Sequence, residues 1–251
     1  MPVKIAEGLS MLQIQNSAGI TVNLVLLHDS QNVILFDTGW PGQLETINEA
    51  IIDERLDLSK LSMIFITHHD MDHIGSLASI RSINPAIRVL TSTGEKEYVQ
   101  FDKLPVKAYG ERLNQVIKSY EKNTGLTIEQ PISDQSAKKL YSNFLTTVDE
   151  VLEDGQELPY CGGIIAIHTP GHTPGHCSFY LKKYRTLVTG DALNIEAGQL
   201  VGPNPIYTGD LPLAMTSLKK FSSYKIDSII CYHGGYLTSP VGMNSAIHFL
   251  I

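Results

Sequence analysis

Residues 63–76, MIFITHHDMDHIGS, place side chains that can bind metal ions directly behind an apolar run. Five of the six positions from 68 to 73 are histidine or aspartate: His68, His69, Asp70, Asp72 and His73. So many imidazoles and carboxylates in one turn would be desolvated or repel one another unless a cation compensated them. A solvated polar turn explains one or two such residues, whereas four potential ligands at this spacing favour a metal site.

Three further apolar runs also end in a histidine or an aspartate close to a glycine. These runs are IHTPGH, ending at His172, LVTGD, ending at Asp191, and CYHGG, which contains His233. A glycine at the end of a strand allows the tight turn that can direct such a side chain into a shared cleft. The sequence therefore predicts that separate strand ends contribute ligands to one centre.

The segments that carry these residues alternate between strand-like and helix-like patterns. Residues 23–39 resemble a hairpin around the turn at 29–32, and Leu44, Ile47, Ile51 and Ile52 recur at helical spacing within residues 42–56. The other predicted strands are 61–67, 87–92, 162–170, 177–183, 185–191 and 227–233, and further helices are predicted to start at 74 and to span 211–224. This alternation predicts two packed sheets with helices outside them.

Residues 94–150 interrupt the alternation with a longer and more polar stretch whose pattern is mostly helical. A long excursion between core strands often covers an active site. We therefore predict a helical cover whose underside is formed by spaced apolar and aromatic residues: Tyr98, Phe101, Tyr109, Leu113, Val116 and Tyr120. The alternative is an insertion that packs on the body and does not affect the site.

The composition restricts the partners and the compartment. The formal net charge of -7, with no run of Lys or Arg, lacks the positive surface that binding to a phosphate backbone needs, so we expect no nucleic-acid partner. The first residues contain no signal-peptide pattern, and no segment reaches the roughly 20 apolar residues that span a bilayer, so we expect a soluble, cytoplasmic protein with no membrane partner. Cys161, Cys177 and Cys231 are few and widely spaced, which predicts reduced thiols.

The motifs occur in the order and spacing of the metallo-β-lactamase superfamily, which this chain resembles. They are LFDTG at 35–39, THHDMDHIG at 67–75, TPGHTPGH at 169–176, TGD at 189–191 and HG at 233–234. The resemblance covers about residues 20–235. It implies a single α+β domain over residues 1–251, built as an αββα sandwich with a two-metal site at one edge of the sheets and with the helical insertion over the active site.

The resemblance also implies a role for each motif residue. One metal ion would be bound by His68, Asp70 and His172. The other would be bound by Asp72, His73 and His233, with Asp191 bridging the two ions.

Two more motif residues are expected to support the ligands, because a ligating imidazole needs a partner for its second ring nitrogen. Asp37 would orient the metal-bearing loop, and His176 would contact the ligand residues without binding the ions itself. A simple turn or structural residue is the alternative at both positions. His69 is adjacent to a ligand and is expected to point elsewhere.

Asp70 departs from the family motif, which usually has a histidine at this position. Two divalent ions carry +4, while Asp70, Asp72, Asp191 and a bridging hydroxide carry -4, so this site can be neutral where the usual one retains +1. A more neutral site should form its hydroxide at higher pH and make it more nucleophilic. We expect two divalent ions and name zinc first. Because oxygen is a harder ligand than imidazole, Asp70 shifts the preference toward iron or manganese, which stay as alternatives.

Hydrolysis is the chemistry that this resemblance favours. Two ions about 3.5 Å apart can hold a hydroxide, polarise a carbonyl or phosphoryl oxygen and stabilise the leaving oxygen. Asp72 is the predicted catalytic residue, which would orient the hydroxide or transfer its proton. Related lactonases use a tyrosine near the bridging aspartate as an oxyanion donor, and Tyr207 is our candidate for this substrate contact, with a structural tyrosine as the alternative.

Departures from individual family members narrow the range of expected substrates. The commonest class B β-lactamases have cysteine where this chain has Asp191, and glyoxalase II enzymes append a helical domain, whereas only 18 residues follow His233. We therefore predict a hydrolase of a small carboxylic ester, lactone or thioester. Two alternatives stay open: a diiron redox enzyme that works with a separate flavin partner, and a noncatalytic sensor that binds a ligand at its metal site. The oligomeric state is not predicted.

Overall fold

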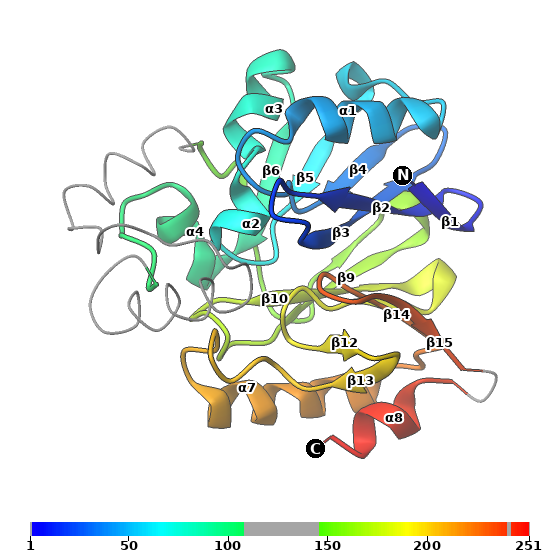
Figure 1. Cartoon of the computed structure of the whole chain (residues 1–251), viewed down its shortest axis with the longest axis vertical. Helices are drawn as coiled ribbons and strands as arrows, with labels where there is room; N and C mark the ends of the chain where they lie inside the picture. Colours follow the sequence, from blue (N-terminus) through cyan, green and yellow to red (C-terminus); the bar gives the residue numbers. More distant parts are fainter. Residues whose placement is uncertain (1, 108–145, 240–241, 251) are drawn as a thin grey trace.

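The computed structural model describes residues 2–107, 146–239 and 242–250. These residues form two β-sheets that face each other, with helices on the outer face of each sheet (Figure 1). The first sheet follows the order of the sequence: β1 (Pro2–Ala6), β2 (Leu9–Gln15), β3 (Thr21–His28), β4 (Val33–Phe36), β5 (Met63–Phe65), β6 (Arg88–Ser92) and β7 (Glu150–Leu152).

The first sheet changes from antiparallel to parallel pairing at β4. Strands β1 to β4 pair antiparallel, and β4 to β7 pair parallel. The predicted hairpin is confirmed as β3 and β4, and its turn is closed by Asp29, whose Oδ1 accepts hydrogen bonds from the N–H groups of Gln31 at 2.8 Å and Asn32 at 2.7 Å. Such side-chain bonds to the backbone are the reason that Asp and Asn favour turns.

The second sheet is built from the C-terminal half of the chain. Its order across the sheet is β15 (Gly235–Thr238), β14 (Ser228–Cys231), β11 (Thr186–Val188), β10 (Cys177–Leu181), β9 (Ile164–His168) and β8 (Glu157–Leu158). Only the β11–β14 pair of this sheet is parallel among the described strands. A separate hairpin consists of β12 (Asn194–Glu196) and β13 (Gln199–Val201).

The helices lie outside the sheets. The α-helices are α1 (Leu44–Asp53), α2 (Met71–Ile74), α3 (Leu77–Ile83), α4 (Thr93–Val99), α7 (Leu211–Ser217) and α8 (Asn244–His248). The 3-10 helices are η1 (Leu58–Lys60), η3 (Tyr160–Gly162), η4 (Lys182–Tyr184) and η5 (Leu218–Ser223). Helices α1 and α3 cover the first sheet, and α7 and α8 cover the second (Figure 1). The helix predicted over 211–224 is therefore α-helical only in its first half.

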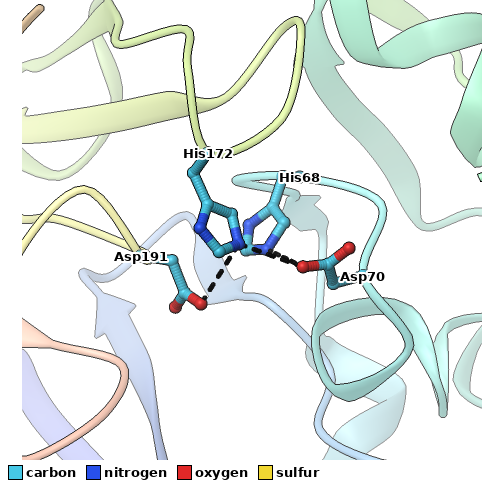
Figure 2. Close-up of side chains that lie close together, drawn as sticks. All are labelled: His68, Asp70, His172 and Asp191. Atoms are coloured by element: carbon cyan, nitrogen blue, oxygen red, sulfur yellow. Dashed lines mark hydrogen bonds and ion pairs between the residues drawn. The ribbon is translucent and has the colours of Figure 1, made fainter. Parts of the chain in front are cut away.

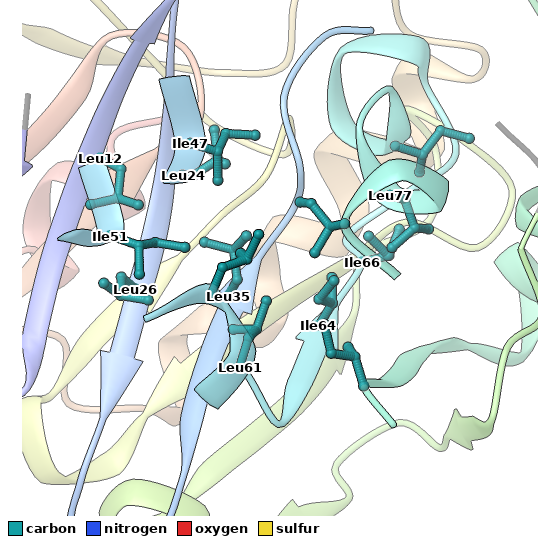
Figure 3. Close-up of a cluster of buried hydrophobic side chains, with 14 of the residues drawn as sticks. Leu12, Leu24, Leu26, Leu35, Ile47, Ile51, Leu61, Ile64, Ile66 and Leu77 are labelled. Atoms are coloured by element: carbon teal, nitrogen blue, oxygen red, sulfur yellow. The ribbon is translucent and has the colours of Figure 1, made fainter. Parts of the chain in front are cut away.

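Apolar side chains fill the space between these layers. Ile47 and Ile51 of α1 pack on leucines of the first sheet such as Leu24 and Leu26 (Figure 3). Between the two sheets, the rings of Phe36, Phe65 and Phe179 lie 5.2–5.4 Å apart, centroid to centroid. Because the alternate residues of β3 face these two cores, its sequence is mostly apolar rather than alternating. The predicted αββα sandwich is confirmed.

The predicted insertion over residues 94–150 lies mostly outside the described residues, because positions 108–145 are among those that the structure does not describe. Its first described part is α4, and its last residue, Glu150, opens strand β7 of the first sheet. The cover therefore stays a prediction. Among the described residues, no helix is long and apolar enough to cross a membrane.

Candidate metal centre

The predicted ligands follow strands of both sheets at one common edge. His68 follows β5, His172 follows β9, Asp191 follows β11 and His233 follows β14. Ligand sites of α/β sheets form at the carboxyl ends of such strands. The turn before Asp191 needs a glycine, because Gly190 has a φ of +53° and an added Cβ would lie 2.7 Å from Nε2 of His176. This agrees with the role that the sequence predicts for glycines beside the ligands.

The first ligand group consists of His68, Asp70, His172 and Asp191, whose side chains converge in Figure 2. Oδ2 of Asp70 lies 3.1 Å from Nε2 of His68 and 3.0 Å from Nε2 of His172. Oδ2 of Asp191 approaches Nε2 of His172 at 3.4 Å. These four side chains therefore offer two imidazole nitrogens and two carboxylate oxygens to one position.

The second ligand group consists of Asp72, His73 and His233. Nε2 of His233 lies 3.3 Å from Oδ2 of Asp72. Oδ1 of Asp191 faces this group, at 3.3 Å from Nε2 of His73 and 3.6 Å from Nε2 of His233. The structure thus brings together all seven predicted ligands in the two predicted sets, and Asp191 directs one oxygen toward each set.

The donor atoms of the centre fit a bound cation. Nε2 of His73 and Oδ1 of Asp191 are buried and have no hydrogen-bond partner within the described part of the chain. Burial disfavours the charged form of His233, but Asp191 and then Asp72 raise its pKa to about 10. The negative charge of these carboxylates therefore favours the protonated form of His233. A histidine that binds a metal ion releases this proton when the ion binds.

His68 has the opposite electrostatic environment. Burial, together with the nearby charge of His73, holds the pKa of His68 well below the usual histidine value. Its Nδ1 lies 3.0 Å from Oγ1 of Thr67. The imidazole of His68 is therefore neutral at physiological pH, and its Nε2 points into the first ligand group.

The carboxylate of Asp37 contacts the loop that carries His68 and His73. Its Oδ2 lies 2.8 Å from Nδ1 of His73, and its carboxylate also accepts hydrogen bonds of 2.8 Å from both the N–H and the hydroxyl of Thr67. Such a contact fixes the tautomer and the orientation of a ligating imidazole. The arrangement leaves Nε2 of His73 as its ligand atom.

His176 contacts Asp191, the residue that faces both ligand groups. Its Nε2 accepts the backbone N–H of Asp191 at 3.0 Å, and its Nδ1 lies 2.8 Å from Oγ1 of Thr169. Burial lowers the pKa of His176 well below its usual value, so the ring is neutral and able to accept this bond. His176 therefore positions the turn that carries Asp191.

The side chain of His69 points away from both groups, as expected, and reveals a residue that sequence reasoning missed. Nδ1 and the backbone N–H of His69 both contact Oε2 of Glu95, which is buried in helix α4. Oε1 of Glu95 accepts the hydroxyl of Thr173 at 2.6 Å and the N–H of Gly175 at 2.8 Å. One carboxylate therefore links the loop of His68 and Asp70 to the loop of His172.

Lys107, Thr208 and Tyr232 were also missed. Nζ of Lys107 contacts Asp70, and Oγ1 of Thr208 lies 3.3 Å from Nδ1 of His172. The ring of Tyr232 stacks on that of His73 with centroids 3.7 Å apart. The sequence signals for these three were weak: Tyr232 adjoins His233, Thr208 adjoins the candidate Tyr207, and Lys107 lies within the predicted cover. Tyr207 is half-buried beside Thr208, and its role in substrate binding stays a prediction.

Comparison with known proteins agrees with this geometry. A family model for the metallo-beta-lactamase superfamily matches residues 19–233. The probable metallo-hydrolase YflN of Bacillus subtilis (strain 168) is 25% identical over 236 residues, covering 86% of this chain and 83% of the relative. The hydroxyacylglutathione hydrolase GloC of Haemophilus influenzae is 27% identical over 213 residues, covering 84% of each protein.

A solved structure shares the fold over nearly the whole chain. It is that of the metallo-beta-lactamase family protein TTHA1429 from Thermus thermophilus, with a TM-score of 0.70 at 22% identity, and the match covers 98% of this chain and 79% of that one. A shorter match of 134 residues at 29% identity links this chain to ribonuclease Z of Listeria monocytogenes, of which it covers 39%.

Proposed function

The chain belongs to the metallo-β-lactamase superfamily, and we propose that this hydrolase cleaves a small carboxylic ester, lactone or thioester at a centre of two divalent metal ions. His68, Asp70 and His172 would bind one ion, and Asp72, His73 and His233 the other. The observation that carries the proposal is the position of Asp191, whose Oδ2 lies 3.4 Å from His172 and whose Oδ1 lies 3.3 Å from His73. A carboxylate placed in this way can serve both ions.

The metal ions, when bound, supply Lewis acidity, which polarises a carbonyl oxygen and lowers the pKa of water. The mixed imidazole and carboxylate donors suit zinc, and the additional carboxylate of Asp70 keeps iron and manganese as alternatives. Asp37 and His176 hold the ligands in place, so that little reorganisation is needed during the reaction.

Solvent exposure favours one side of the centre for substrate entry. The side chains of Asp72 and His233 are 16% and 34% exposed, whereas those of His68 and His73 are fully buried. The side chain of Asp72 is therefore partly open to solvent, and its carboxylate can take a proton from water and pass it to a leaving group. Tyr207 remains our candidate for a substrate contact.

A thioester is the substrate class to test first, because the relative GloC is named as a hydrolase of a glutathione thioester. A small-molecule substrate also suits the net charge of -7, which disfavours a phosphate backbone. The ribonuclease Z match covers too little of that protein to outweigh the charge, but a short RNA belongs in the assay as a comparison.

The experiment is a substrate panel on zinc-loaded protein, comprising matched thioesters, esters and lactones together with the RNA. We expect turnover of at least one of the three small-molecule classes, loss of turnover on chelation and recovery on adding zinc. At saturating zinc, Asp72→Asn should lower kcat by about 100-fold or more, in the range of general acid–base catalysis. Asp53→Asn, an aspartate at the end of α1, is the matched control and should leave kcat unchanged. Full zinc occupancy with no turnover of any small molecule would contradict the proposal.

A further inference from the structure

Lys107 is a buried lysine that contacts the first ligand group. Its Nζ contacts Oδ2 of Asp70 and lies 2.9 Å from Nε2 of His172, and its side chain is only 10% exposed. These are the same two atoms that face the other members of the first group. An ammonium ion and a metal ion would therefore use the same lone pairs.

The second ligand group differs in this respect. Its members form ion pairs among themselves and with neighbouring aspartates, and within the described ranges no lysine or arginine pairs with Asp72, His73 or His233. Among the described residues, a lysine therefore pairs with the first ligand group, whereas no lysine or arginine pairs with the second.

The backbone beside Lys107 is held in place by His69. The N–H of Val106 donates to Nε2 of His69 at 3.3 Å, while Nδ1 of His69 contacts the carboxylate of Glu95. Because that carboxylate accepts, Nδ1 carries the proton and Nε2 is free to accept from Val106. The ring of Tyr98 stacks on His69 with centroids 4.4 Å apart and planes 17° from parallel. These contacts hold the backbone next to Lys107 close to the first ligand group.

The charge of Lys107 also matches the unusual residue of this chain. Asp70 adds a carboxylate where the family motif usually has a neutral histidine, and Lys107 compensates it. A divalent ion that enters the first group must displace the ammonium from Asp70 and His172 and then remain close to its positive charge. At the second group, an entering ion does not have to displace any described lysine or arginine.

We propose that Lys107 makes the two halves of the centre unequal, so that the first ligand group binds its metal ion more weakly than the second because the Lys107 ammonium competes for Asp70 and His172. This inference rests on the proposed two-metal centre. Lys107 acts through the ligands and is a positioning residue for the metal site, not a catalytic residue.

The test is a zinc titration of the metal-free protein in competition with a chromophoric chelator, which reports binding without any assay of activity. We expect two dissociation constants about 100-fold apart in the unaltered protein. Lys107→Met should tighten the weaker constant by about ten- to 100-fold and leave the tighter one unchanged. His172→Ala should remove the weaker constant, which assigns it to the first group.

Two matched variants separate charge from packing. Lys107→Arg keeps the positive charge and should keep the two constants apart. Lys103→Met removes a charge from the same segment, but Lys103 is exposed and pairs with Glu97 at 2.5 Å, so this variant should leave both constants within about twofold. If Lys107→Met does not fold, as judged by circular dichroism, Lys107→Gln takes its place in the titration.

The possible outcomes distinguish the two proposals. Two zinc ions in both the unaltered protein and Lys107→Met, with unchanged constants, would overturn the role of Lys107 and leave the two-metal centre intact. A single zinc ion at saturation, in both the unaltered protein and Lys107→Met, would overturn the two-metal centre itself. The inference is supported if the weaker constant tightens in Lys107→Met but not in Lys107→Arg or Lys103→Met.

Discussion

Oδ2 of Asp37 lies 2.8 Å from Nδ1 of His73, although the two residues are 36 positions apart in the sequence. Asp37 reaches this position from the end of β4 with a φ of +60°, a left-handed conformation that aspartate and asparagine tolerate better than most residues. The contact fixes which ring nitrogen of His73 is left for a metal ion.

Asp37→Asn keeps the tolerated backbone conformation and removes the charge behind His73. We expect zinc binding at the second ligand group to weaken by about tenfold to 100-fold, the usual effect of losing such a supporting contact. Competition titration would measure it, with Asp53→Asn as the control. An unchanged tighter zinc constant would show that Asp37 has no influence on the metal site.

Asp191→Ala removes the carboxylate that faces both groups. We expect turnover to fall by at least about 1,000-fold and both zinc constants to weaken, because each ion would lose a ligand. Metal analysis after gel filtration, together with kinetics at high zinc, would measure both effects. Loss of one zinc ion with the other still tightly bound would refute the bridging role.

Asp70→His restores the residue that the family motif usually has. Because imidazole nitrogen is a good zinc ligand, we expect two zinc ions to remain bound and turnover to stay within about tenfold. Lys107 would then lack its carboxylate partner, so Asp70→His combined with Lys107→Met should bind the weaker ion more tightly than Asp70→His alone. Complete loss of metal from the first group in both variants would mean that position 70 is not a ligand position.

Gly94→Ala tests the close approach of α4 to the loop of His172. Alanine normally stabilises a helix by about 1 kcal/mol relative to glycine. Here an added Cβ would lie 2.6 Å from Cα of Gly175, so we expect the free energy of unfolding to fall by about 1–3 kcal/mol instead. Urea unfolding would measure the change, and Ser79→Ala on the outer side of α3 is the control, expected within about 0.5 kcal/mol. Stabilisation by Gly94→Ala would contradict the contact.

The periodicity of the sequence predicted strands β3 to β6 of the first sheet and β9, β10, β11 and β14 of the second. It missed the remaining strands: β1, β2, β7, β8, β12, β13 and β15. Alternation of short apolar runs with amphipathic helices is a local property, and so are the turn residues 29–32. The sequence predicted one helix over 211–224, whereas the structure has an α-helix that changes to 3-10 geometry at Leu218. Periodicity alone does not determine where one helical hydrogen-bond pattern replaces the other.

The sequence by itself determined which residues can bind metal ions, because histidines and aspartates at the ends of apolar runs need only local spacing to be found. The tertiary structure decided which way each carboxylate of the centre points, with Asp191 facing both groups. It also decided that Lys107 reaches Asp70 from 37 positions away and that Glu95 joins the loops at His69 and Thr173. Such contacts depend on how closely α4 packs against the ligand loops, which Gly94 and Gly175 permit by lacking side chains, and no spacing along the chain encodes that distance.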